Sequence, residues 1–521
     1  MSTIPASSSA GSPSGVAAAS NTAFFGHPRG LSTLFFTELW ERFSYYGMRA
    51  LLILFMTAPL TAGGLGFDTA KAGVIYGAYT ALVFLMSVPG GWIADRFLGQ
   101  RRATLYGGVV IMLGHISLAV PSLTAFFLGL TLLITGTGLL KPNISTMVGQ
   151  LYSPEDHRRD AGFSIYYMGI NLGAFLAPLA TGWLAQGAQF RRILATAGIT
   201  PETSWHWGFG LAAVGMFLGL IQYLAGWRHL GTAGLEPVPP ENPEAGAADR
   251  RRLALGILLV VGAGGFLAFL VTSGRLVLTP ELVSNGFGIL LLGIVVIVFG
   301  GLFLSGEWTP TERKNLVVIL VLFLASSIFW ALYEQAGSTL NLFAQRNTDT
   351  SLFGRPFPPS WFQSVPPLLV ILLAPVFAWL WVKLGEGEPS SPAKFVLGLL
   401  GAGLGFAVLI LPAQASADGV RVGPLWLLLT YLLHVMGELC LSPVGLSATT
   451  RLAPARVVGF MMGVWFLSIS VGSYLGGRVA SLYEAFALPD LFGVVTACGL
   501  VAAAVLALLL KPIARMVARA V

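Results

Sequence analysis

The residues of this sequence that are best suited to chemistry are ionisable side chains placed inside long apolar stretches. Four of them stand close together near the start of the chain, at helical spacing: Glu38, Glu41, Arg42 and Arg49. Residues three, four and seven positions apart share one face of a helix. Buried carboxylates and guanidinium groups on such a face bind the charged ends of a ligand or carry a proton, because an unpaired buried charge is costly. The alternative is a structural charge cluster that joins helices.

Three further ionisable residues lie in apolar surroundings and complete a set with unequal charge. Lys141 follows a Gly-rich stretch, Glu334 follows an aromatic run, and Glu438 stands between two apolar runs. The whole set holds three cations and four carboxylates, so one bound proton would balance it. We therefore expect these groups to bind a proton as well as a ligand.

Elements that cross a lipid bilayer must hold these charges, because the composition leaves too few polar residues for a surface in water. Apolar residues make up 55% of the 521 residues and charged residues 10%, whereas about 25% of a soluble protein is charged. About 20 apolar residues in a row span a bilayer. The sequence has many such runs, and we count fourteen predicted spans, which begin near Leu31, Ala72, Ala103, Phe126, Gly162, His206, Leu253, Val283, Lys314, Ser360, Phe395, Pro424, Val457 and Leu491. The predicted fold class is an all-α membrane protein.

The fourteen predicted spans divide into six, two and six, with a Pro- and Glu-rich linker at 231–249 after the first six. The predicted domains are a disordered cytoplasmic tail at 1–30, a six-helix bundle at 31–229, the linker with two extra helices at 230–309, a second six-helix bundle at 310–515 and a cytoplasmic tail at 516–521. A faint repeat relates the bundles, since Pro142 and Pro443 are each followed nine residues later by leucine. Parallel repeats place a binding site between the halves, near the bilayer midplane. The repeat sets Lys141 and Glu438 at neighbouring levels in opposite halves, where they would pair when that side closes.

The placement of the basic residues predicts how the chain is oriented in the membrane. Most of the 30 Lys and Arg residues fall on the side of the N-terminus, although Arg191 and Arg192 do not. The positive-inside rule then puts both termini in the cytoplasm. This placement accounts for the net charge of +7 without nucleic-acid binding.

Cys440 and Cys498 lie in apolar runs and are expected to be small core residues rather than a disulfide or a metal site.

Four stretches of the sequence carry distinctive patterns. Glu38 opens the pattern E-x-x-E-R-F-x-Y-Y-G, Phe163 opens F-x-x-Y-Y-M-G-I-N-L-G-A-F, and Gly437 opens G-E-L-x-L-S-P-x-G-L. Gly91 opens G-x-x-x-D-R-x-x-G-x-R-R, which resembles a loop motif shared across the major facilitator superfamily. Together the patterns resemble the signatures of one branch of that superfamily, the proton-dependent oligopeptide transporters, in its bacterial form. The resemblance implies a major facilitator fold with two extra helices, and import of di- and tripeptides with protons by alternating access across the bacterial inner membrane. We expect the protein to be a monomer.

The resemblance also implies roles for individual residues in binding. Those expected to bind the peptide are Arg42, Tyr45, Tyr46, Lys141, Asn171, Trp330, Glu438 and Trp465. The two cations of this set, with the tyrosines nearby, would hold the peptide carboxylate, and Asn171 with Glu438 would hold its amine. The two tryptophans would border side-chain pockets, and the alternative for each is a ring that faces lipid or the membrane interface.

Two gates follow from the same resemblance. Arg49 with Glu334 would form the outer gate, and Lys141 with Glu438 would form the inner gate. Each pair joins a cation of the first half to a carboxylate of the second.

Two positions depart from the family pattern. The eighth helix usually carries Asn before Pro, where this chain has Pro366-Pro367, and the second helix often carries Tyr, where it has Phe84. Both changes remove hydrogen-bonding groups from the expected cavity, and the prolines should bend the helix or leave carbonyls free near the cavity. We therefore expect weak dipeptide binding with apolar side chains preferred; the alternative is that Pro366 is a packing variant. His115 and His434 are expected to be bystanders whose hydrogen bonds are satisfied.

Other functions stay open on the sequence. A proton-linked antiporter that exports small solutes or drugs would not need a cation and a carboxylate placed for the two ends of a zwitterion. A nutrient receptor would keep the fold without turnover. A membrane-embedded enzyme is not supported, because the sequence shows no nucleophile–base pair, metal-ligand cluster or phosphate-binding loop, and we expect no metal and no cofactor.

The groups expected to take part in proton coupling are Glu38, Glu41, Arg42 and Glu334, and we predict that Glu41 and Glu334 carry it while Glu38 mainly orients Arg42. Glu41→Gln and Glu334→Gln each mimic permanent protonation. Each variant should retain exchange of labelled dialanine across proteoliposome membranes and lose accumulation driven by a pH gradient. Accumulation against the substrate gradient by both variants would refute the assignment.

Overall fold

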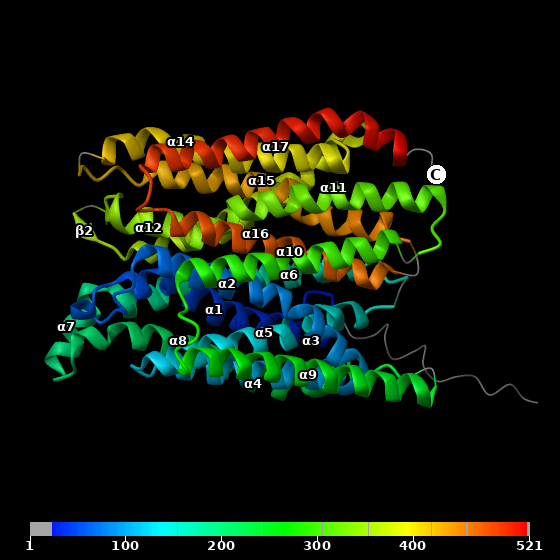
Figure 1. Ribbon diagram of the computed structural model, residues 1–521, viewed down its shortest axis with the longest axis horizontal. Coiled ribbons are helices and arrows are strands. Elements are labelled where there is room, and N and C mark those ends of the chain that lie inside the picture. Colours follow the sequence, from blue (N-terminus) through cyan, green and yellow to red (C-terminus); the bar gives the residue numbers. More distant parts are fainter. Residues whose placement is uncertain are drawn as a thin grey trace, which may run out of the picture.

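Long, nearly parallel helices make up almost the whole of the computed structural model (Figure 1). It describes residues 23–153, 155–240, 242–304, 306–352, 354–417, 419–454 and 457–517. A short hairpin joins β1 (Ser351–Leu352) to antiparallel β2 (Arg355–Pro356). The predicted all-α fold class is confirmed. Most of the predicted tails falls on residues 1–22 and 518–521, which lie outside the described residues.

The helices follow the predicted order of six, two and six long segments. The first bundle contains α1 (Arg29–Thr57), α2 (Thr69–Leu85), α3 (Ser87–Ile93), α4 (Gln100–Leu118), α5 (Leu123–Gln150), α6 (Arg159–Gln186), α7 (Ala188–Thr196) and α8 (Ser204–Gly226). The two extra helices are α9 (Pro243–Thr272) and α10 (Pro280–Leu304). The second bundle contains α11 (Pro310–Tyr333), α12 (Thr339–Arg346), α13 (Val365–Leu384), α14 (Ser391–Ser416), α15 (Leu425–Leu452), α16 (Val458–Ser481) and α17 (Leu488–Val517).

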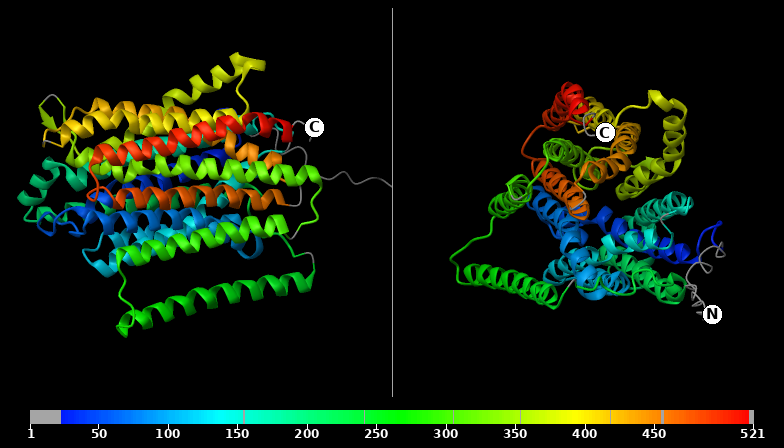
Figure 2. Two further views of the ribbon diagram at one scale, coloured as in Figure 1. Left: turned by 45° about the horizontal axis from the view of Figure 1, so that its top comes forward. Right: turned by 90° about the vertical axis from the view of Figure 1, so that its right-hand side faces the viewer.

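Helix α9 begins inside the predicted linker. Asn242 caps it by accepting a hydrogen bond from the Ala245 N–H, and Pro243 stands in the first turn, where a missing N–H costs nothing. Asp249 is buried and pairs with Arg96 of the first bundle at 3.7 Å. The predicted linker was therefore too long, because capping extends the helix beyond its apolar run. Beyond Asp249, α9 is exposed almost throughout and extends away from the bundles (Figure 2).

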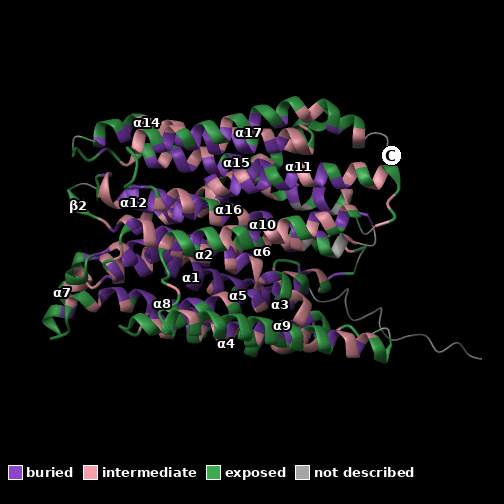
Figure 3. Cartoon of the chain, viewed as in Figure 1, coloured by how far each residue is buried: buried purple, intermediate pink, exposed green. Residues whose placement is uncertain are grey.

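Eleven helical runs of the described residues are long and apolar enough to cross a membrane. Helix α1 is not among them, and it carries four charged side chains in its middle. It is instead buried along almost its whole length by the helices around it. Figure 3 shows buried residues gathered along α1 and its neighbours, and exposed residues along α9 and α17. The fold thereby keeps the charged helix away from lipid.

The two bundles approach each other most closely where α2 meets α16. A Cβ atom on Gly477 would lie only 2.3 Å from the Cα of Gly77, so these backbones are in direct contact. Nearby, the Ser470 hydroxyl donates a hydrogen bond of 2.8 Å to the Ala81 carbonyl. Glycine is required at this crossing because any side chain would push the bundles apart.

Polar contacts between the bundles gather at the end of the molecule where α1 ends and α2 begins, which we call the closed end. There the Asn341 side chain donates to the Ala50 carbonyl at 2.8 Å. The Ser364 hydroxyl donates to the Phe175 carbonyl at 2.7 Å. These bonds tie the start of the second bundle's α12 and α13 to α1 and α6 of the first bundle.

A charged latch secures the closed end at its surface. Glu484, between α16 and α17, accepts a 2.5 Å hydrogen bond from the Thr69 hydroxyl and pairs with Arg346 at 2.6 Å. The hydrogen bond from Thr69, followed by that from Arg346, holds the pKa of Glu484 below its ordinary value. A lowered carboxyl pKa gives stabilisation that is present above the ordinary pKa and is lost as the pH falls through the lowered one. The latch therefore stays charged at neutral pH.

The structure corrects the expectation that Pro366 and Pro367 bend a helix. A 3₁₀ turn (Pro359–Ser364) leads into α13, which begins at Val365, so both prolines stand in the first helical turn. Backbone N–H groups of a first turn have no helical acceptor, and proline is favoured there. The expectation failed because the helix was taken to start near Ser360.

The Gly77–Gly477 contact makes a testable prediction about packing. Gly477→Ala would place a Cβ against backbone, and overpacking of this kind costs about 1–3 kcal/mol. Its melting temperature in detergent, followed by intrinsic fluorescence, should fall below that of the wild type. Gly256→Ala on α9 is the matched control, because its Cβ would meet nothing within 4 Å. Equal melting of the two variants would contradict the backbone contact.

Candidate functional site

A buried charge cluster on α1 forms the deepest part of the candidate site. The Arg42 Nε atom lies 2.9 Å from Glu38 Oε1 and also contacts the Glu41 carboxylate. All three residues are almost fully buried. Within the described residues, Glu38 Oε2, both carboxylate oxygens of Glu41 and Arg42 Nη2 lack a well-directed hydrogen bond. Buried charged atoms of this kind call for further partners, so the cluster is suited to take up a ligand group, water or a proton.

A second buried ion pair joins the two bundles at the closed end. The Arg49 Nη2 atom lies 2.6 Å from the Glu334 carboxylate, and the Arg49 Nε–H donates to the Tyr76 hydroxyl at 2.8 Å. Glu334 opens a 3₁₀ turn (Glu334–Gly337) directly after α11. The structure thus brings together the two residues expected to form the outer gate.

Lys141 and Glu438 do not pair in this structure, and each rests on an aromatic residue instead. The Lys141 Nζ atom lies 3.7 Å from the centre of the Phe84 ring and 6.0 Å from that of Phe466. Glu438 accepts a hydrogen bond from the Tyr333 hydroxyl. Both charged residues are half-buried, unlike the fully buried cluster on α1. The expected inner gate is therefore apart while the opposite end is closed.

Phe84 has a contact that the sequence did not reveal. It was expected only to remove a hydroxyl group, but its ring face meets the Lys141 ammonium within the range of a cation–π interaction. Such an interaction is worth about 0.5–2 kcal/mol, depending on how far the cation is desolvated. The phenyl ring therefore positions the cation.

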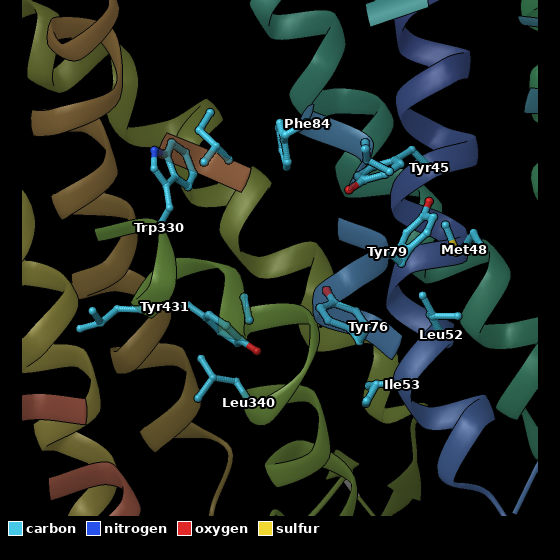
Figure 4. Packing of buried hydrophobic residues seen from close by; sticks show 14 of the residues in the cluster. Tyr45, Met48, Leu52, Ile53, Tyr76, Tyr79, Phe84, Trp330, Leu340 and Tyr431 are labelled. Carbon is cyan, nitrogen blue, oxygen red and sulfur yellow. The ribbon is translucent and has the colours of Figure 1, made fainter. Parts of the chain in front are cut away.

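The remaining residues expected at the site lie on helices of both bundles. Tyr45 lies with its ring 5.5 Å from the Arg42 guanidinium, and Tyr46 lies 5.8 Å from that of Arg49. Figure 4 shows Trp330 of α11 on one side, with Tyr45 of α1 and Phe84 of α2 on the other. Asn171 is buried, and its amide donates to the Tyr167 carbonyl at 3.0 Å.

Both tryptophans expected at the site lie inside the protein. Trp330 and Trp465 are both buried, at 8% and 7% exposure, so neither ring faces lipid.

The two histidines that were expected to be bystanders differ in their hydrogen bonds. His434 is buried with Nε2 3.1 Å from the Ala402 carbonyl. His115 is fully buried, but neither ring nitrogen has a hydrogen-bond partner among the described residues. The expectation of a satisfied bystander was therefore wrong for His115, and for His434 it holds only at Nε2, because Nδ1 has no hydrogen-bond partner among the described residues.

Two tyrosines of the site were missed by sequence reasoning. Tyr76 holds Arg49, and Tyr333 holds Glu438. Tyr333 directly precedes Glu334, and that adjacency was the available signal. Tyr76 gave no signal, because its contact with Arg49 depends on how α1 and α2 pack.

Opposite charges buried between two six-helix bundles, with one end closed, define a transporter with the major facilitator fold. This chain belongs to the POT family, whose sequence profile matches residues 101–495. It is a multi-pass inner-membrane protein and not an enzyme.

Similar proteins cover nearly the whole chain. It is 44% identical over 492 residues to the uncharacterized transporter YclF of Bacillus subtilis (strain 168), covering 94% of this chain and 95% of that protein. It is 40% identical over 510 residues to the peptide transporter YePEPT of Yersinia enterocolitica subsp. palearctica serotype O:3 (strain YE-P4), covering 95% and 96%. A crystal structure of a peptide transporter POT in complex with sulfate matches with a TM-score of 0.86 at 45% identity, over 96% of this chain and 98% of that one.

The Arg49–Glu334 pair should be strongly coupled in stability. Removing one partner of a buried pair costs about 3–5 kcal/mol, because the other charge is left unpaired. Arg49→Met and Glu334→Met should each lower the unfolding free energy, and the double variant should lose clearly less than the sum. Arg346→Met is the control, since it removes half of an exposed pair worth about 0.2–1 kcal/mol. Additive losses at Arg49 and Glu334 in chemical unfolding would contradict a direct pair.

Proposed function

We propose that this protein imports di- and tripeptides together with protons by alternating access, with both termini in the cytoplasm. One observation carries the proposal: Lys141 and Glu438, opposite charges from opposite bundles, stand unpaired while the Arg49–Glu334 pair closes the other end. Relatives that are 40% identical over nearly their whole length are named di-/tripeptide transporters, which supports the choice of substrate.

A free peptide is a zwitterion, and the charges of the site match its two ends. Lys141 and Arg42 would receive the carboxylate, and Glu438 with Asn171 would receive the amine. Charge-assisted hydrogen bonds to these ends are stronger than neutral ones. Because every peptide carries the same two ends, recognition through them tolerates varied side chains, for which Trp330 supplies an apolar wall.

Proton coupling is supported by the surplus of carboxylates. Glu38 and Glu41 share the single guanidinium of Arg42, so a proton on one of them leaves a balanced pair. A proton on Glu334 would remove the charge that holds Arg49 and so release the closed end. Protons arriving from outside would thereby favour opening toward the outside. All of these groups belong to one chain, which supports a monomer as the working unit.

The proposal is tested by uptake of labelled dialanine into proteoliposomes. The wild type should accumulate dialanine when the outside is acidic, and exchange it without a gradient. Lys141→Ala and Glu438→Ala should each reduce uphill uptake at least about tenfold, because a lost hydrogen bond to a charged group is worth about 1.5–3 kcal/mol.

Matched controls separate the site from general damage. Lys383→Ala and Glu386→Ala remove the same residue types at exposed positions beyond the site and should transport as the wild type does. Binding without exchange would identify a receptor, and efflux driven by inward proton flow would identify an antiporter; either result would overturn the proposal.

A further inference from the structure

We propose that Tyr333 is a positioning residue that couples the occupation of Glu438 to the state of the Arg49–Glu334 pair. The inference rests on the proposed function, since it assigns the peptide amine to Glu438. It concerns how a ligand in the site is sensed at the closed end.

Tyr333 connects α11 to α15 through a hydrogen bond. Its hydroxyl donates to the Glu438 carboxylate, and its ring is half-buried at the site. Among the described residues this is the hydrogen bond that the Glu438 side chain makes. Tyr333 therefore holds the carboxylate while no peptide is present.

The ring of Tyr333 is held by the aromatic residues of the preceding turn. It stacks on Phe329 with centroids 5.6 Å apart and planes at 23°, and it meets Trp330 edge-on at 5.5 Å. These two contacts restrict the orientation of the ring and hence the direction of its hydroxyl. Movement of this ring is therefore coupled to movement of the end of α11.

Tyr333 is the last residue of α11, and Glu334 is the first of the following 3₁₀ turn. A 3₁₀ stretch has weaker hydrogen bonding than an α-helix and often marks a hinge. Consecutive Cα atoms are held about 3.8 Å apart by the peptide bond. Movement of Tyr333 away from Glu438 is therefore transmitted to the carboxylate that holds Arg49.

The same turn packs directly against Arg49, the partner of Glu334, and against Tyr76, which accepts a hydrogen bond from Arg49. A Cβ atom on Gly337 would lie 2.0 Å from the Tyr76 hydroxyl and 2.9 Å from Arg49 Nε. With no room to spare, a displacement of the turn must disturb Arg49 and Tyr76 as well. The contacts of Glu438 and of Arg49 thus lie at the two ends of one short segment.

A peptide amine competes with Tyr333 for Glu438. The ammonium brings a positive charge and three N–H donors, whereas the tyrosine offers one neutral O–H. When the amine takes the carboxylate, Tyr333 loses its acceptor and the end of α11 is freed. Peptide binding should therefore increase the fraction of molecules that are open at the closed end.

Spin labels across the closed end test this coupling. Leu60 and Phe486 are exposed there in different bundles and accept labels as Leu60→Cys and Phe486→Cys, after Cys440 and Cys498 are replaced by serine. Adding dialanine should shift the distance distribution of the wild type toward longer distances. Tyr333→Phe, which keeps the ring and removes the hydroxyl, should reduce that shift at least about threefold.

Tyr474→Phe is the matched control. Tyr474 is a half-buried tyrosine of the same bundle whose hydroxyl donates to the Ser284 carbonyl at 3.0 Å, away from the site. It should keep the full response to dialanine. A response in Tyr333→Phe equal to that of Tyr474→Phe would overturn the coupling and leave the proposed function standing, whereas no response in the wild type would overturn both.

A double variant separates coupling from a merely structural effect. In Glu438→Gln the response to dialanine should already be reduced, and adding Tyr333→Phe should reduce it little further. Independent, additive losses would show that Tyr333 acts through some route other than Glu438 and would overturn the proposal.

Discussion

The cost of leaving a charge unpaired in a low-dielectric interior governs this structure. Helix α1 carries carboxylates as well as guanidinium groups through the middle of the molecule, and each guanidinium group needs a carboxylate partner there. Arg42 finds its partners on its own helix, in Glu38 and Glu41, whereas Arg49 finds Glu334 in the opposite bundle. The first arrangement is internal to one bundle and survives any movement between the two. The second depends on the bundles being together, so the same electrostatic requirement that stabilises α1 also makes its surroundings sensitive to their separation.

Aromatic residues hold the charges that have no ionic partner in this state. Lys141 rests on Phe84, and Glu438 accepts a hydrogen bond from Tyr333. A cation–π contact is worth about 0.5–2 kcal/mol and a single hydrogen bond to a carboxylate about 1.5–3 kcal/mol, and neither supplies the opposite charge that an end of a bound peptide would bring. They satisfy the charges enough to keep them in place and are weak enough to be displaced. Strong ionic partners at these positions would hold the site shut against its substrate.

The sequence predicted most of the fold because two signals in it are local. Apolar runs placed nearly all helix starts within a few residues, and the spacing of charges identified the buried face of α1. Contacts between distant helices could not be predicted from such local patterns. Phe84 was therefore expected only to remove a hydroxyl group, and the contact of Tyr333 with Glu438 was missed. Pro366 was misjudged because a 3₁₀ turn, not a helix, precedes it. His115 was expected to be satisfied, yet burial alone does not supply a partner, and its ring nitrogens have none among the described residues.

The chain connection between the bundles has a mechanical consequence. Its first helix, α9, is tied to the first bundle through Asp249 and Arg96, and α10 is tied to the second through Ser284, which bonds to Tyr474 and Arg478. Between these two anchorages nearly every residue of α9 is exposed. The connection therefore acts as a flexible tether. It limits how far the bundles can move apart, but it exerts little torque on them and stores little elastic energy in either position.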